Sequence, residues 1–140
     1  MRKKIWLIVI ALFLSLVVYC VYDKFDSARR LKQNFGLLKG EIVDLRMDIM
    51  NGHSLDITYK VNIDGKEITR SKNFGFEKKG GLEIYNILYR RPIDVVYEKG
   101  DPENCDLLLH RSDYKEYKLI PSRQAVYMLD ALEVACGVIE

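Results

Sequence analysis

The stretch IWLIVIALFLSLVVYCVY, residues 5–22, sets how the rest of the chain is organised. Its eighteen residues include no charged side chain, and Arg2, Lys3 and Lys4 stand directly before it. As an α-helix with a rise of about 1.5 Å per residue it is roughly 27 Å long, close to the apolar thickness of a bilayer. We therefore predict that residues 5–22 span a lipid bilayer and anchor the chain.

Two other readings of this stretch are a cleaved signal peptide and a lipoprotein signal. A signal-peptidase site needs small residues at positions −3 and −1, and residues 18–22 offer no such pair. A lipoprotein signal needs a small residue directly before its cysteine, whereas Tyr19 precedes Cys20. Trp6 near one end, with Tyr19 and Tyr22 at the other, matches the aromatic belts of a membrane interface. The pattern favours an uncleaved anchor and leaves a cleaved signal peptide as the alternative.

The orientation of the anchor is read from the basic residues at its two ends. Positive charge lies on both sides, at Arg2, Lys3 and Lys4 before the stretch and at Lys24, Arg29, Arg30 and Lys32 after it. A short basic head followed by an apolar run is typical of a signal anchor with its N-terminus in the cytoplasm. We expect the remainder of the chain to lie outside the cytoplasm.

Length and charge constrain the part of the chain after the anchor. Of 140 residues, 118 remain after position 22, which suits one small domain. The net charge of +2, from 22 basic and 20 acidic residues, gives no reason to expect a nucleic-acid partner. We divide the chain into a membrane anchor at 1–22, a juxtamembrane linker or helix at 23–38, and a single β-rich domain with a C-terminal helix at 39–140.

The clearest pattern in the domain is a two-residue alternation that predicts strands with one apolar face. It runs through residues 43–49 and 55–63, and the dipeptides Asn51-Gly52 and Asp64-Gly65 are strong hairpin signals. A third strand is expected from residue 66 to about 72. The predicted inward residues of the first two strands are Val43, Leu45, Met47, Ile49, Leu55, Ile57, Tyr59, Val61 and Ile63.

The C-terminal part of the chain changes to a helical period. Residues 93–97 and 107–109 read as short strands, and Ser122 as the N-cap of a helix. One apolar face of that helix holds Ala125, Met128, Leu129, Leu132, Ala135, Cys136 and Ile139. The predicted class is α+β: an N-terminal transmembrane helix, a small antiparallel β-sheet or barrel-like domain, and a C-terminal amphipathic helix. One core should join Leu129 and Leu132 to Leu45, Met47, Ile57, Tyr59, Val61 and Val95.

Turn and core residues over positions 36–110 form three further motifs. They are Gly40-Glu41-Ile42-Val43, then Asp64-Gly65-Lys66, then Pro92, Val95 and Tyr97 followed by Asp101-Pro102, Cys105 and Leu107-Leu108. With them the chain resembles a bacterial family of small membrane-anchored β-domain proteins classed as a domain of unknown function. The chain departs from that pattern in Ile93-Asp94 and in a cysteine at the small-residue position. The resemblance implies a compact β domain beside a membrane, without an established activity. Together with the predicted anchor, we expect a single-pass protein of the bacterial inner membrane.

Residues that carry chemistry are sparse in this sequence. Neither His53 nor His110 has a second ligand at metal-binding spacing. Cys105 and His110 are five positions apart, but a packed cysteine beside an exposed histidine is commoner than a nucleophilic pair. Asp101, Glu103 and Asp106 read as a solvated turn. We predict no catalytic, cofactor-binding or metal residue, hence no enzyme, no cofactor and no small-molecule substrate.

Two pairs of residues remain as candidates. Cys105 and Cys136 either form a disulfide or stay free thiols, because Cys20 lies in the apolar stretch. Tyr114 and Tyr117 stand among charged residues and are a possible exposed partner surface, although tyrosines packed along their own fold are commoner. The leading functional reading is a membrane-tethered binding or scaffolding module with an unknown protein partner. The alternative is a membrane-anchored immunity or inhibitor protein that neutralises a toxin.

Overall fold

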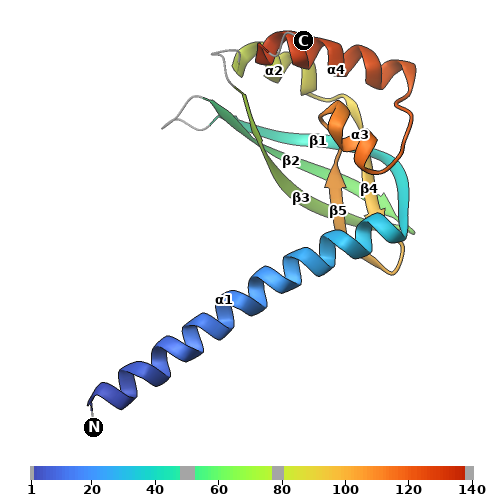
Figure 1. Cartoon of the computed structure of the whole chain (residues 1–140). Coiled ribbons are helices and arrows are strands. Elements are labelled where there is room, and N and C mark those ends of the chain that lie inside the picture. Colours follow the sequence, from blue (N-terminus) through green and yellow to red (C-terminus); the bar gives the residue numbers. More distant parts are fainter. Residues whose placement is uncertain (1, 48–52, 77–80, 138–140) are drawn as a thin grey trace.

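The computed structural model describes residues 2–47, 53–76 and 81–137, and it has a long N-terminal helix beside a compact β domain (Figure 1). The predicted α+β class is confirmed. In chain order the elements are α1 (Arg2–Gln33), β1 (Phe35–Met47), β2 (Ser54–Ile63), β3 (Lys66–Gly75), α2 (Gly81–Leu88), β4 (Pro92–Glu98), β5 (Asp101–Leu107), α3 (Arg111–Glu116) and α4 (Arg123–Cys136).

The five strands form one antiparallel sheet that curls into a nearly closed barrel. Their order across the sheet is β3-β2-β1-β4-β5. The alternation predicted for β2 is confirmed, since every second residue from Leu55 to Ile63 is buried. Asp64 and Gly65 have φ of 53° and 83°, as a tight two-residue hairpin requires. The predicted turn at Asn51-Gly52, and Ile49 beside it, lie outside the described residues.

Strand β1 departs from the predicted alternation at one bulge. The register shifts between Ile42 and Asp44, which inserts Val43 as an extra residue opposite β2. A bulge of one residue exchanges the faces of a strand. Ile42 and Leu45 are therefore the buried residues, whereas Val43 and Met47 are 44% and 45% exposed. The prediction that Val43 points inward is wrong for this reason. Met47 follows Leu45 by two residues on the same face, opposite the buried Leu55, and is half-exposed at the end of the strand.

Two glycines let β1 pass close to the side chains of β4. Gly36 and Gly40 pair with Tyr97 and Ile93. A Cβ at Gly36 would collide with the Tyr97 ring, and one at Gly40 would lie 2.7 Å from Val95 Cγ2. Glycine at such points is typical of a strand that bends tightly around a barrel.

The barrel is covered by helices, and the core is one cluster. Leu45, Ile57, Tyr59, Val61 and Val95 share that cluster with Leu129 and Leu132, as predicted, while the predicted member Met47 does not. Helix α4 begins where predicted, because Ala125 N donates to Ser122 Oγ at 3.2 Å. Its predicted buried face is confirmed from Ala125 to Cys136; Ile139 lies outside the described residues.

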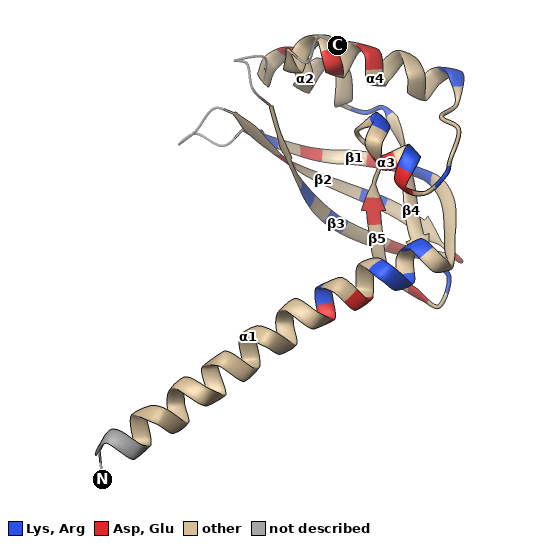
Figure 2. Ribbon diagram, in the orientation of Figure 1, with Lys and Arg blue, Asp and Glu red and all other residues tan. Residues whose placement is uncertain are grey.

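The two edge strands, β3 and β5, meet through side chains rather than through a backbone ladder. Arg70 and Lys72 stand on the inner face of β3, opposite Tyr59 and Ile57. Arg70 donates to the carbonyl of Glu103 at 2.7 and 3.0 Å, and Lys72 Nζ donates to the carbonyl of Leu107 at 2.7 Å. Carboxylates of β5 complete this seam, with Lys66 2.8 Å from Glu103 and Lys72 2.9 Å from Asp106 (Figure 2). Inward-pointing basic side chains protect both edges against pairing with another chain.

The seam predicts an acid-sensitive contribution to stability. The hydrogen bond and charge of Lys66, with the charge of Arg70, hold the pKa of Glu103 below its ordinary value of 4.5. A carboxylate with a lowered folded-state pKa stabilises the fold above its unfolded pKa and loses that contribution as pH falls through the folded value. Glu103→Gln should therefore lower the thermal midpoint at pH 6, and this difference from wild type should shrink toward pH 3.

That difference is measured by circular dichroism of the full chain in detergent at pH 6, 4 and 3. The matched variant is Glu67→Gln. Glu67 is a carboxylate of β3 that pairs with Lys60 at 3.7 Å on the outer face of the sheet, away from β5. A Glu103→Gln deficit that stays constant over the whole pH range would show that the ion pair does not contribute.

Helix α1 is joined to the domain only by its last turns. Leu31 is 4% exposed in the core, and Asn104 Nδ2 donates to the carbonyl of Ser27 at 2.8 Å. Residues 5–22 lie apart from the domain, with Trp6, Tyr19 and Tyr22 between 67% and 69% exposed. The helix is a candidate membrane span from Ile5 to Gln33, with mean hydropathy 2.7 and none of its apolar window buried. Figure 2 shows charged residues gathering where α1 reaches the domain.

Candidate binding surface

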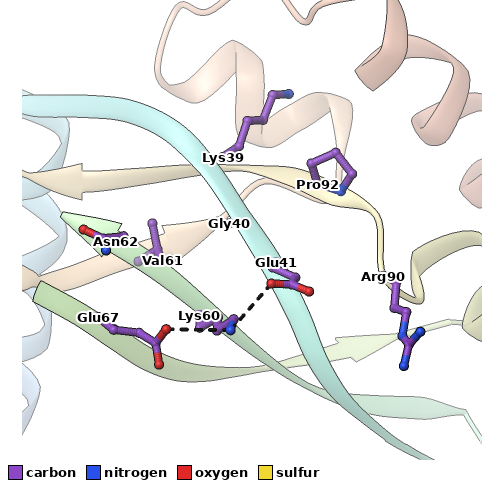
Figure 3. A pocket seen from close by; sticks show the side chains of 9 residues that line it. All are labelled: Lys39, Gly40, Glu41, Lys60, Val61, Asn62, Glu67, Arg90 and Pro92. Atoms are coloured by element: carbon purple, nitrogen blue, oxygen red, sulfur yellow. Dashed lines mark ion pairs between the residues drawn. The ribbon is translucent and has the colours of Figure 1, made fainter. Parts of the chain in front are cut away.

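A shallow groove of about 420 Å³ lies on the outer face of the barrel, over β1 and β2 and beside the loop that leads from α2 to β4 (Figure 3). It is lined by Lys39, Gly40, Glu41, Lys60, Val61, Asn62, Glu67, Arg90 and Pro92. The outward positions of β1 and β2 supply its floor because their inward neighbours fill the barrel. The groove is therefore an exposed surface on the sheet that combines charged side chains with apolar atoms.

The charges along the groove differ in how far they are neutralised. Lys60 lies between two carboxylates, 3.6 Å from Glu41 and 3.7 Å from Glu67. Lys39 Nζ lies 2.6 Å from a carboxylate oxygen of the buried Asp94. Arg90 has no carboxylate within ion-pair distance among the described residues. Arg90 is therefore the cation that this groove presents to a partner.

Aromatic rings support Arg90 at the end of α2. Its guanidinium carbon lies 5.2 Å from the centre of the Tyr89 ring, and Tyr89 stacks on Tyr85 at 5.0 Å. Arg90 has a φ of 56°, a left-handed conformation that costs a non-glycine residue free energy and occurs often at functional sites. An exposed arginine beside tyrosines has the composition of a binding hot spot. We call Tyr85, Tyr89 and Arg90 the α2 cluster.

Tyr114 and Tyr117 are buried, so they do not form the possible exposed partner surface, and the alternative of tyrosines packed along their own fold applies. Tyr114 is 2% exposed, and its hydroxyl donates to Asp94 at 2.7 Å. Burial, followed by Asp94, raises its pKa. Tyr117 is 9% exposed and packs edge-on against Phe35 at 5.2 Å; burial raises its pKa to about 12. The charged residues around Tyr114 suggested an exposed surface. They do not predict its burial, because α3 is a short helix that turns one face, with Tyr114, toward the sheet.

The cysteine and histidine candidates have separate surroundings. Cys105 Sγ lies 3.7 Å from the Tyr59 hydroxyl, whereas the His110 ring stacks on Phe74 at 5.0 Å. Burial raises the pKa of the Cys105 thiol, which keeps it protonated and weakly nucleophilic. Cys105 and Cys136 are free thiols in this structure, one on β5 and the other buried at the end of α4.

Asp101, Glu103 and Asp106, read from the sequence as a solvated turn, instead lie on strand β5. Glu103 and Asp106 pair with basic residues of β3. Among the residues that the structure describes, no three His, Cys, Asp or Glu side chains gather as a metal site would require. The absence of a cofactor and of catalysis stays a prediction.

Comparison of the chain with models of protein families, with curated proteins and with solved structures finds no match. The resemblance to a family of membrane-anchored β-domain proteins therefore stays a prediction. The fold defines a class of protein in which one candidate membrane span precedes a small antiparallel barrel.

The α2 cluster was missed by sequence reasoning. Residues 82–89 fit a short helix or a strand equally well, so Tyr85 and Tyr89 were not placed on one face. The run Tyr89-Arg90-Arg91-Pro92 carried the available signal, an aromatic residue and two cations directly before a proline, which disfavours a helical conformation in the residue that precedes it.

Proposed function

We propose that this protein is a membrane-tethered binding module, held in a bilayer by residues 5–22 and presenting its barrel to a protein partner at the membrane surface. One observation carries the tether: an uncharged, eighteen-residue helical stretch stands wholly exposed beside a domain that buries its own core. Exposed apolar surface of this extent is not tolerated in water. A bilayer supplies the missing apolar environment.

The attachment of α1 supports presentation of one defined face. Arg30 lies 3.8 Å from Glu98, Lys32 pairs with Glu116, and Leu31 enters the core. These contacts restrain the barrel relative to the axis of α1. The α2 cluster and the outer groove therefore keep a fixed orientation relative to the bilayer. Arg90, an exposed cation backed by two rings, suits a partner that offers a carboxylate beside an apolar group.

One experiment tests tether and binding together. Membranes that contain the tagged full chain are washed with alkaline carbonate, cross-linked, solubilised and purified by the tag. We expect the chain to stay in the membrane fraction, and its intact mass should correspond to a chain that starts at Met1 or Arg2. We also expect one cross-linked partner to be enriched. Tyr89→Ala combined with Arg90→Gly should reduce that partner at least fivefold, because the ring and the cation are both lost.

The choice of Arg90→Gly separates binding from folding, because glycine adopts the positive φ of this position without strain. Arg123→Ala, an exposed cation at the start of α4, is the matched control and should leave capture unchanged. Release of the chain by carbonate with a mature N-terminus near Asp23 would contradict the tether. Equal capture by wild type and the double variant would contradict the proposed surface.

A further inference from the structure

The segment of α1 beyond the apolar stretch carries four basic residues, and the fold neutralises two of them. Arg30 lies 3.8 Å from the buried carboxylate of Glu98, and Lys32 pairs with Glu116 of α3. These two cations are used within the chain, where they fasten α1 to the domain. They contribute little free charge to the surface near a bilayer.

The other two cations, Lys24 and Arg29, form no ion pair within the described part of the chain. A shallow apolar hollow of about 360 Å³ on the face of α1 is lined by Val21, Lys24, Phe25 and Ala28. Arg29 directly follows Ala28 and lies one helical turn beyond Phe25. The Phe25 side chain is 74% exposed. The lining positions have the i, i+3, i+4, i+7 spacing of one helix face. An exposed aromatic ring and two unneutralised cations therefore share one side of the helix.

This face lies at the depth of the lipid headgroups when residues 5–22 cross the bilayer. Phe25 is three residues beyond Tyr22, roughly 5 Å along the axis, and Arg29 is roughly 10 Å beyond it. The headgroup region on each side of a bilayer is about 5–8 Å thick. The ring of Phe25 then falls near the acyl boundary, and the cations reach the phosphate layer by extending their side chains.

We propose that Lys24 and Arg29, together with the apolar hollow at Phe25, form a binding site for an anionic phospholipid. The two cations hold the phosphate and headgroup, and the first carbons of an acyl chain lie on the hollow. This inference rests on the proposed tether. A second copy of the chain fits the same face less well, because parallel helices would bring their Lys24 and Arg29 side chains together as like charges.

Native mass spectrometry of the full chain in detergent tests the proposal with phosphatidylglycerol and phosphatidylcholine as probes. The wild-type chain should retain phosphatidylglycerol in preference to phosphatidylcholine. Lys24→Gln combined with Arg29→Gln should weaken phosphatidylglycerol binding roughly 25-fold, since each basic residue near an anionic surface contributes about fivefold. Arg30→Gln combined with Lys32→Gln removes the same charge from the same segment and should change binding less than about threefold.

Three results would overturn the site. They are unchanged phosphatidylglycerol binding in the Lys24/Arg29 variant, equal losses in both double variants, and a chain dimer that persists in the Lys24/Arg29 variant but disappears with Phe25→Ala. Lipid binding is measured on the protein in detergent, so the result does not depend on whether the chain stays in membranes after the carbonate wash. Failure of the tether and failure of the lipid site are therefore distinguishable.

Discussion

Replacing Ile57 by alanine is expected to lower the free energy of unfolding of the β domain by about 2–5 kcal/mol. Ile57 is 0% exposed on the inner face of β2, at the centre of the barrel. The loss has two parts, the transfer free energy of the deleted carbons and a cavity that a curled sheet cannot collapse. Leu132→Ala should cost a similar amount, because Leu132 is 2% exposed and brings α4 into the same cluster. Either loss is a large share of the stability of a small domain.

Urea unfolding of the full chain in detergent, monitored by far-ultraviolet circular dichroism, measures both changes. Asp56→Ala is the control, because Asp56 is exposed on the outer face of the same strand; it should change stability by less than about 0.5 kcal/mol. A small effect of Leu132→Ala beside a large effect of Ile57→Ala would mean that the barrel is correct and that α4 does not cover it.

Replacing Leu14 by arginine is expected to disfavour membrane insertion by roughly 3 kcal/mol, about a hundredfold in the insertion equilibrium. Leu14 lies near the middle of residues 5–22 and is 57% exposed to the surroundings of α1. A charged group placed at the centre of a bilayer loses its hydration there, and the described part of the domain buries none of this apolar window. The β domain should fold unchanged, because it begins to contact α1 only near Ser27.

Insertion is measured in microsomes from the fraction of chains that gain a glycan at an acceptor site engineered downstream of the helix. Leu14→Val is the matched control, since valine and leucine differ by no more than about 0.3 kcal/mol at the helix centre. Equal insertion of wild type and the arginine variant would contradict a membrane-spanning role for this stretch.

Much of the fold is predictable because its signals are local in sequence. The face of β2, the hairpin at Asp64-Gly65 and the N-cap at Ser122 each depend on residues a few positions apart. The apolar stretch of α1 is equally local. Propensity and periodicity therefore identify these elements before any contact between them is known.

The seam, the burial of Tyr114 and the bulge depend on contacts between distant parts of the chain. The seam joins Arg70 to Glu103, thirty-three positions later, and Tyr114 is buried because its hydroxyl meets Asp94, twenty positions earlier. The bulge at Val43 also depends on the partner strand. Periodicity carries no information about such pairings, so the inward and outward assignments failed there.

By itself, the sequence determined that a charge-free stretch at residues 5–22 precedes one small domain, and that this domain pairs an alternating sheet with an amphipathic helix. Those features arise from the spacing of apolar residues along the chain. That spacing is a property of each segment and does not depend on contacts with other segments. Only the tertiary structure decided which cations remain free. It pairs Arg30 and Lys32 with carboxylates of the domain and leaves Lys24, Arg29 and Arg90 without carboxylate partners among the described residues. The reason is that neutralisation of a charge depends on distance in space, and folding brings together carboxylates that lie far apart in the chain.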